Sequence, residues 1–350
     1  FPQITLDREY INDNWITRLE NEWIRFDHSN ADDVGDNTLV GDRTRLKYSI
    51  EFDHSGDAGF LRPRLQTQYL GYALNDTKLS TGANSNPSII VPQAIIDSGL
   101  YFDRNGNGYQ QTFEPRLFYF YSPSKNQTDL TGSGRTINFD TANRTFNYSQ
   151  LFTDTRFSGG DRIDDANQLS IGLTTRFIGS TSGREIFSAS IGKALYFEDR
   201  EVTLSGQRDT ENNSPIATLF TANINENWAF TNDTIYDDDT NDTNISTTSL
   251  KYRNDDSRLI NFTHRFVENR SEQAEVSFIL PINSNDWSII GHYNYDYKND
   301  RDLEQLLGFE YHSCCYRLRL AFKRFIDDDQ FLNTAANIEY DKAAILEFQF

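Results

Sequence analysis

Alternation of apolar and polar residues with a period of two constrains this chain more than any other feature of its sequence. In the stretch QLSIGLTTRF (168–177), apolar residues alternate with polar or small ones: Leu169, Ile171, Leu173 and Phe177 against Ser170, Gly172, Thr174 and Arg176. The pattern recurs in FSASIGKALYF (187–197), WSIIGHYNYDYKND (287–300) and CCYRLRLAFKRF (314–325). Successive side chains of a β-strand point to opposite faces, so each stretch predicts a two-faced strand. Few stretches favour a helix, and we expect an all-β protein.

The length and spacing of these strands favour a large antiparallel transmembrane β-barrel. The strands are about 10 residues long and begin roughly every 20 residues, a wider spacing than small sandwiches have. Tyr, Phe and Trp lie near strand ends, as in the aromatic girdles of barrels, and charged residues occupy mid-strand positions of the polar faces. We expect about 16 strands. A secreted β-sandwich or β-solenoid also has one apolar and one wet face, so alternation alone leaves those folds open.

Charge and organisation narrow the choice further. The chain holds 33 basic and 52 acidic residues, a net charge of −19, which excludes the basic footprint of a nucleic-acid-binding protein. No apolar run is long enough for a transmembrane helix. No linker interrupts residues 1–350, so we expect a single domain. The sequence contains no methionine and ends on AAILEFQF, which resembles the middle of a strand, so we expect a fragment of a longer protein.

One stretch imitates a calcium-binding loop. DRNGNGYQQTFE (103–114) matches the spacing of an EF-hand loop at five positions: Asp103, Asn105, Asn107, Gly108 and Glu114. An EF-hand needs a helix on each side, whereas the flanking stretches predict strands and Pro115 follows the supposed bidentate glutamate. We expect a hairpin turn rich in Asn and Gly, and no metal site.

No stretch predicts an enzyme. The histidines at positions 28, 54, 264, 292 and 312 are scattered, and neither H-E-x-x-H nor G-x-S-x-G occurs. No glycine-rich phosphate loop opens a helix, so we expect no cofactor. The acidic tract NDTIYDDDTNDTN (232–244) is most simply a solvated loop.

The two cysteines of the chain are adjacent, Cys314 and Cys315. Neighbouring residues of a strand point to opposite faces, and a bridge between them would strain ordinary disulfide geometry. The surrounding sequence predicts a strand end, where a turn would let both thiols reach one neighbour. The residues alone leave two interpretations open: a pair of free thiols, or two bridges to cysteines outside this sequence.

Several blocks resemble the LptD family of outer-membrane lipopolysaccharide (LPS) translocons. SCCYRLRLAFKRF (313–325) resembles the Cys–Cys strand of that family. QQTFEPRLFYFYSP (110–123) is similar to its Thr-Leu-Glu-Pro-Arg strand, and LFTDTRFSGGDRIDDANQLSIGLTTRF (151–177) to its Gly-Gly-Asp-Arg-Ile block. LKYRNDDSRLINFTHRF (250–266) and DWSIIGHYNYD (286–296) also have counterparts. The matches are collinear and cover nearly the whole chain.

The resemblance implies the barrel of an LPS translocon in the outer membrane of a Gram-negative bacterium. Its expected partners are an LptE-type lipoprotein plug, an LptA-type periplasmic bridge reached through a β-jellyroll, LPS and outer-membrane lipid. It implies that Cys314 and Cys315 pair with cysteines of an N-terminal region, one each. The jellyroll and the first barrel strands are missing from this sequence by comparison with the family.

The resemblance also implies that LPS leaves sideways, between the first and last strands of the barrel. The last strand would be one side of this lateral gate, formed by Ala344, Ile345, Leu346, Glu347, Phe348, Gln349 and Phe350. Two alternatives remain at this point: a diffusion porin, which needs no cysteine pair, and a soluble secreted β-protein.

Overall fold

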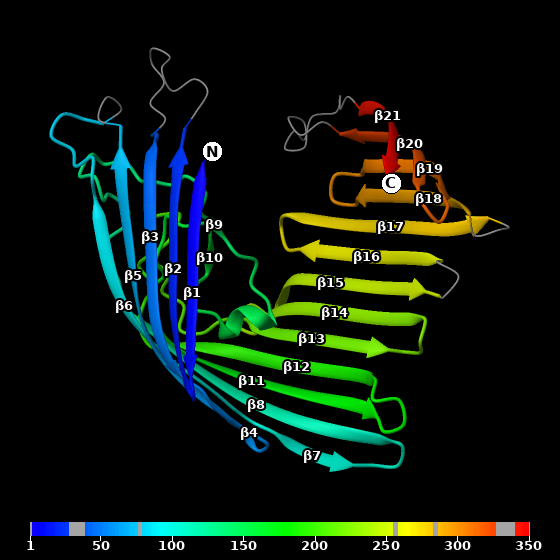
Figure 1. Cartoon of the computed structure of the whole chain (residues 1–350), viewed down its shortest axis with the longest axis horizontal. Coiled ribbons are helices and arrows are strands. Elements are labelled where there is room, and N and C mark those ends of the chain that lie inside the picture. The colour runs from blue at the N-terminus through cyan, green and yellow to red at the C-terminus, as the bar shows by residue number, and fades with distance from the viewer. Residues whose placement is uncertain are drawn as a thin grey trace. The chain divides into compact units, whose positions relative to one another are not determined.

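The chain folds almost entirely into β-strands (Figure 1). The structure, a computed structural model, describes residues 2–27, 39–75, 79–254, 258–282, 286–326 and 340–349. These residues contain one large sheet of 19 strands and a two-stranded sheet. Among the helices of these residues, none has the length and apolar composition needed to cross a membrane. The expectation of an all-β, predominantly antiparallel fold is confirmed.

The strands are numbered along the chain. The first group is β1 (Gln3–Asn12), β2 (Trp15–Phe26), β3 (Gly41–Phe52), β4 (His54–Gly56), β5 (Gly59–Leu74), β6 (Ser88–Leu100), β7 (Phe102–Asn105), β8 (Tyr109–Ser122), β9 (Ala142–Asn143), β10 (Phe157–Ser158), β11 (Ala166–Gly179) and β12 (Glu185–Tyr196). The second group is β13 (Ile216–Asn223), β14 (Trp228–Asp237), β15 (Asp242–Arg253), β16 (Leu259–Val267), β17 (Ser271–Ile282), β18 (Trp287–Asp296), β19 (Arg301–His312), β20 (Arg317–Ile326) and β21 (Tyr340–Gln349). A 3₁₀ helix, η2 (Tyr148–Phe152), lies between β9 and β10.

Consecutive strands pair antiparallel over long, regular registers. The sheet has 19 strands, where about 16 were expected. Two short strands account for part of this difference. Strand β4 pairs with β5, as β3 does, and β7 begins one residue after the end of β6. Both are brief continuations of longer neighbours.

In β11 and β20, the large apolar side chains are exposed and the side chains of the opposite face are covered. In β11, Ile171 is 45% exposed, whereas its neighbour Ser170 is fully buried and Thr174 nearly so. In β20, Phe322 is 62% exposed and Ala321 is buried. A soluble sandwich would bury its apolar faces instead. The alternation predicted from sequence is therefore confirmed, with the orientation that a membrane barrel requires.

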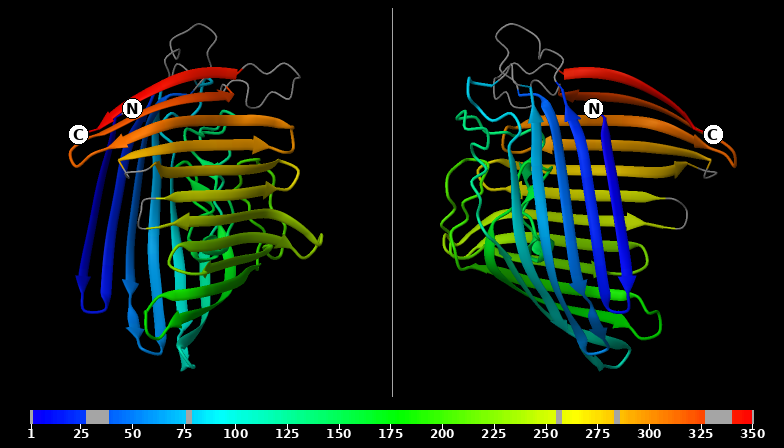
Figure 2. Two further views of the ribbon diagram at one scale, coloured as in Figure 1. Left: turned by 90° about the vertical axis from the view of Figure 1, so that its right-hand side faces the viewer. Right: turned by 60° about the vertical axis from the view of Figure 1, so that its left-hand side comes forward.

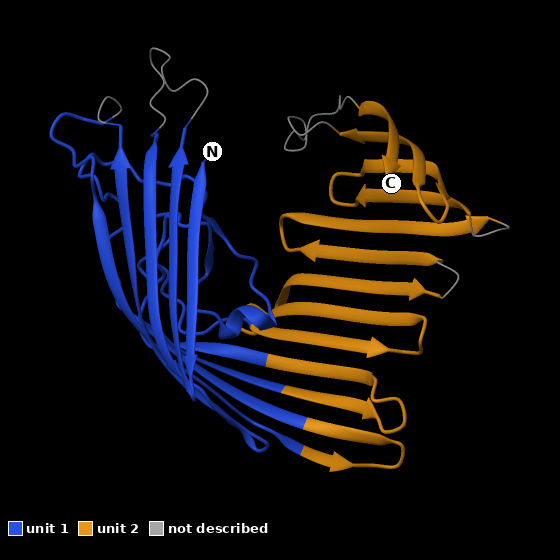
Figure 3. Ribbon diagram, viewed as in Figure 1, with its two compact units in different colours: residues 1–102, 113–173, 192–215 blue, residues 103–112, 174–191, 216–350 orange. Residues whose placement is uncertain are grey.

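The chain divides into two compact units (Figure 3). Unit 1 comprises residues 1–102, 113–173 and 192–215, and unit 2 comprises residues 103–112, 174–191 and 216–350. The boundary passes through β7, β8, β11 and β12, so these strands contribute to both units. A single domain over residues 1–350 stays a prediction.

Unit 1 has its own hydrophobic core beneath a long connection. The segment 123–165, which carries β9, η2 and β10, packs against one face of β3, β5 and β6. The core cluster is Leu70, Tyr72, Leu74, Val91, Ile137 and Ile163. A second cluster joins Ile95, Phe118, Phe120 and Ala166, with Phe152 of η2 packed on it. The connection therefore covers part of one face of the sheet in unit 1, where apolar side chains form two clusters.

In unit 2, β13–β21 follow one another as antiparallel neighbours (Figure 2). The connections alternate between the two ends of the strands. One end carries the connections 238–241, 268–270, 297–300 and 327–339, and the other carries 224–227, 254–258, 283–286 and 313–316. We call the second end the short-turn end, because each of its connections spans four or five residues, whereas the long connection 197–215, which precedes β13, reaches the first end.

Candidate functional site

The two cysteines lie in the turn that joins β19 to β20, at the short-turn end of unit 2. Ser313 donates its backbone N–H to the carbonyl oxygen of Tyr316 at 2.9 Å, which closes the turn around them. Both thiols are free and exposed, and their Sγ atoms lie 2.8 Å apart. Because neither residue belongs to a strand, the two side chains need not diverge to opposite faces.

The contact between the thiols affects their chemistry. A hydrogen bond with Cys314 raises the pKa of the Cys315 thiol. The thiolate is the species that attacks disulfides and alkylating agents, so a raised pKa lowers the reactivity of Cys315 at neutral pH. The turn thus presents two accessible thiols, and the contact with Cys314 lowers the reactivity of Cys315.

The last strand, β21, pairs with β20 along its whole length, from Arg317↔Gln349 to Ile326↔Tyr340. On one face lie Ala344, Leu346 and Phe348, and on the other Ile345, Glu347 and Gln349. Leu346 is 72% exposed. Glu347 accepts a hydrogen bond from Arg319 of β20 at 2.9 Å. Phe350, which the sequence also placed in this strand, lies outside the described residues.

The polar face of β17–β21 carries a series of contacts between basic side chains and carboxylates. Arg319 holds Glu310 through Nε at 3.1 Å and Nη2 at 2.7 Å. Lys323 lies 3.1 Å from Glu304. His292 lies 3.5 Å from Glu275 and 4.0 Å from Glu304. Such a face is suited to contact with water, in contrast to the exposed Leu, Phe and Tyr side chains on the other side.

A buried charged cluster fixes the connection 123–165 to the sheet of unit 1. Arg43 of β3 is 1% exposed and contacts three carboxylates. Its Nη1 lies 2.6 Å from Asp140 and 3.0 Å from Asp161, and its Nη2 lies 3.0 Å from Glu22. Asp161 also accepts hydrogen bonds from the Tyr72 hydroxyl at 3.0 Å and from two backbone N–H groups. Arg43 is the cation that faces the fully buried Asp161, and an unpaired charge buried here would be costly.

The two glycines before Asp161 allow this approach. Gly159 has φ = +69°, and a Cβ there would meet the Asp140 backbone oxygen at 2.3 Å. A Cβ on Gly160 would meet the Arg43 guanidinium at 2.5 Å. The Gly-Gly-Asp-Arg block was recognised in the sequence as a family signature without a structural role. Asp161 lies 118 residues from Arg43 in the sequence, so no local sequence pattern could reveal this contact.

The stretch that imitates a calcium loop forms a hairpin turn. Asp103 and Asn105 lie in β7, Asn107 lies in the turn and Glu114 lies in β8, so strands flank the loop instead of helices. Gly106 donates its backbone N–H to the Tyr109 carbonyl at 2.7 Å. Across residues 2–27, 39–75, 79–254, 258–282, 286–326 and 340–349, no group of three or more His, Cys, Asp or Glu side chains is arranged to hold a metal ion.

Comparison with known proteins gives one consistent family. The family described as LPS transport system D (LptD) matches residues 1–305. The LPS-assembly protein LptD of Saccharophagus degradans is 36% identical over 370 residues, covering 100% of this chain and 43% of the relative. That of Hahella chejuensis is 34% identical over 356 residues, covering 99% and 43%. The chain therefore spans about two fifths of the length of these relatives.

Two solved receptor structures are similar to this chain, each with a TM-score below 0.5. BauA, the ferric preacinetobactin receptor from Acinetobacter baumannii, has a TM-score of 0.45 and 11% identity, covering 99% of this chain and 64% of that one. The ferric-catecholate import receptor Fiu from E. coli in its open form has a TM-score of 0.38 and 11% identity, covering 99% and 72%.

Proposed function

This chain belongs to the LptD family of outer-membrane β-barrel proteins, and from that premise we propose that it takes part in delivering LPS to the outer membrane. The relatives are named for LPS assembly and not for catalysis. The observation that carries the proposal is the orientation of the sheet, with its apolar face exposed and its polar face covered or ion-paired.

That orientation fits the physical task. LPS has an anionic sugar head and apolar acyl chains, and moving those chains through water costs about 0.8 kcal/mol per CH₂ group. A wall with a polar inner face and an apolar outer face allows the head to cross while the chains stay in lipid. The protein's contribution is a path, and no covalent step is required.

We propose that lateral release uses the edge of β21. Strand β1 pairs with β2 on one of its sides, and β21 pairs with β20 on one of its sides. The six described gate residues, 344–349, present both an apolar and a polar face along this edge. An opening there would let the head and the acyl chains of one LPS molecule separate into different environments.

We propose that Cys314 and Cys315 each bridge to a cysteine of an N-terminal periplasmic region. Short turns of outer-membrane barrels face the periplasm, and the cysteine turn lies at the short-turn end. The periplasm is an oxidising compartment. Both thiols are exposed, which leaves them accessible to a neighbouring domain.

The proposed partners follow from the same family. An LptE-type lipoprotein would occupy the lumen against the polar face, and an LptA-type bridge would deliver LPS through a jellyroll. Outer-membrane lipid would cover the exposed apolar face. In this proposal, residues 1–350 form one barrel domain.

The test combines two measurements on the native full-length protein in its own membrane. Delivery is followed as newly made LPS reaching the cell surface while the protein is depleted and restored. We expect delivery to stop on depletion and to resume on restoration; uninterrupted delivery would refute the function. Bridging is followed by gel migration without reductant. A shift that persists in Cys314→Ser and in Cys315→Ser but vanishes in the double variant supports two separate bridges.

A further inference from the structure

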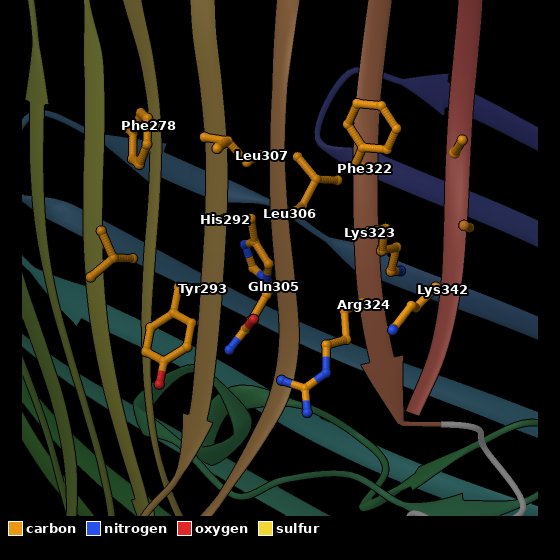
Figure 4. Close-up of a pocket in the computed structure, with 13 residues that line it drawn as sticks. Phe278, His292, Tyr293, Gln305, Leu306, Leu307, Phe322, Lys323, Arg324 and Lys342 are labelled. Atoms are coloured by element: carbon orange, nitrogen blue, oxygen red, sulfur yellow. The ribbon is translucent and has the colours of Figure 1, made fainter. Parts of the chain in front are cut away.

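A groove of about 640 Å³ opens on the apolar face of unit 2, across β17–β21 (Figure 4). Its lining includes a group of apolar side chains, Phe278, Leu307, Phe322 and Ala344. Next to them, toward the end of β20 that carries Ile326, lie Tyr293, Gln305, Arg324 and Lys342. The groove is therefore amphipathic along the strand direction, apolar at one end and cationic at the other.

The pairing register brings the two cations together. Arg324 and Lys342 are direct cross-strand partners of β20 and β21, so both project from the same face. Like charges directly opposite each other destabilise a strand pair. The next pair toward the short-turn end, Lys323↔Ala343, faces the other side and holds one cation only. The arrangement at Arg324 and Lys342 thus has an electrostatic cost that an anion would relieve.

The neighbouring carboxylate compensates one of these charges. Asp302 lies 3.3 Å from Arg324 Nη1 and accepts a hydrogen bond from the Tyr293 hydroxyl at 2.8 Å. The Arg324 guanidinium also stacks 3.7 Å above the Tyr340 ring. Lys342 is exposed and has no hydrogen bond or ion pair with the residues that the structure describes. One positive charge on a face of exposed apolar side chains is left without a counterion.

Arg324 and Lys342 lie at the level along the strands that lipid headgroups would occupy in the membrane. Arg324 lies two residues beyond Phe322, about 7 Å along the strand. Tyr293 and Tyr295 stack at 6.3 Å, and Tyr295 and Tyr297 meet at 5.0 Å, in the same region. Tyrosines gathered at a strand end mark the boundary between hydrocarbon and headgroups. The end in question is opposite the cysteine turn, and on the proposed function it faces the cell exterior.

We propose that this groove binds one LPS molecule from outside the barrel, next to the last strand. A phosphate of its headgroup sits on Arg324 and Lys342, and an acyl chain lies along Phe278, Leu307 and Phe322. The site rests on the proposed function, since it assumes that LPS reaches the edge of β21. It would hold a released molecule at the gate in the orientation of the outer leaflet.

The experiment places a photoreactive p-benzoylphenylalanine at Phe322 of the native protein, in cells, and detects crosslinked LPS with an antibody. Phe325 is the matched control, because it is an aromatic residue of the same strand on the opposite face, paired with Glu304. We expect an LPS adduct at Phe322. We expect Arg324→Gln/Lys342→Gln to reduce it about tenfold, since charge-assisted contacts are lost. The charge-matched control Arg317→Gln/Arg319→Gln, two cations of the polar face that lie against Glu310 and outside the groove lining, leaves the adduct in place.

Three results would overturn the site: no LPS adduct at Phe322, an equal adduct in the Arg324→Gln/Lys342→Gln protein, or adducts with phosphatidylglycerol in place of LPS. Surface delivery of LPS is measured in the same cells. Delivery without an adduct refutes the groove and leaves the proposed function standing. Delivery that continues after depletion of the protein refutes the proposed function itself.

Discussion

Arg43 and Asp161 meet at 3.0 Å in unit 1, and the side chains are 1% and 0% exposed. Asp161 is fixed by the Tyr72 hydroxyl and by the backbone N–H groups of Phe139 and Asp140. The pair links strand β3 to the connection 123–165, which otherwise has little regular structure. Both Nη atoms of Arg43 are paired with carboxylates, whereas its buried Nε has no hydrogen-bond partner among the described residues. Loss of the guanidinium would leave the buried Asp161 carboxylate without its cation, which is costly.

Arg43→Ala should therefore lower the free energy of unfolding by about 3–5 kcal/mol, because it leaves the Asp161 carboxylate buried without its cation. The measurement is a urea titration of the protein in detergent micelles, followed by tryptophan fluorescence. Arg25→Ala is the control, since Arg25 pairs with Asp42 at 2.8 Å on the surface and its loss should change little. Equal stability of the Arg43 and Arg25 variants would contradict the anchoring role.

Gly159→Ala should destabilise the protein by more than Gly132→Ala, although both glycines have φ near +70°. A side chain in that conformation costs about 1–2 kcal/mol at either position. At Gly132 the new Cβ enters open space, whereas at Gly159 it meets the Asp140 backbone oxygen at 2.3 Å. Overpacking should add about 1–3 kcal/mol there. Urea midpoints of the two variants measure the difference, and similar midpoints would show that the connection shifts without cost.

The strands of unit 2 could be predicted from sequence because the environment enforces their alternation. Leu320 and Phe322 are exposed and Ala321 between them is buried, so the alternation in the sequence corresponds to the two faces of the sheet. The turn at Cys314 and Cys315 could also be predicted from the sequence, because the period-two pattern breaks there. In both cases, the signal lies within about ten neighbouring residues.

The charged anchor and the groove could not be predicted in this way. Arg43 and Asp161 are 118 residues apart, and neither lies in a pattern that distinguishes it from a surface residue. Arg324 and Lys342 become neighbours only through the register of β20 and β21, which an intervening connection separates in sequence. Register and long-range packing are properties of the folded chain, and a local pattern carries no information about them.

Acid should remove one contribution to the stability of unit 1 between about pH 4 and pH 2. Burial by itself would raise the pKa of Asp154, but Lys47 at 2.8 Å, with Arg64 and Gln66 nearby, lowers it to about 2. A carboxyl with a lowered folded-state pKa stabilises the fold above its unfolded value, near 3.9, and loses that contribution as pH falls through about 2.

Asp154→Asn tests this contribution. At pH 7 the variant should be less stable than the native protein by about 2 kcal/mol, and the difference should shrink as the pH falls from about 4 to about 2. Urea midpoints at stepped pH values give the comparison. A difference that stays constant across that range would show that the Asp154 charge is not the source of the stability.

Cys314→Ala should make Cys315 react faster with iodoacetamide at neutral pH in the reduced protein. The hydrogen bond with Cys314 raises the pKa of the Cys315 thiol, so its removal lowers that pKa and increases the thiolate fraction. The measurement is the alkylation rate of Cys315 against pH, read by mass spectrometry of the peptide that contains the turn. The rate profile should move to lower pH in the variant, while Ser313→Ala, which keeps both thiols, should move it less. A profile that does not move in Cys314→Ala would mean that the two thiols are not in contact in solution, and that each is free to approach its own partner.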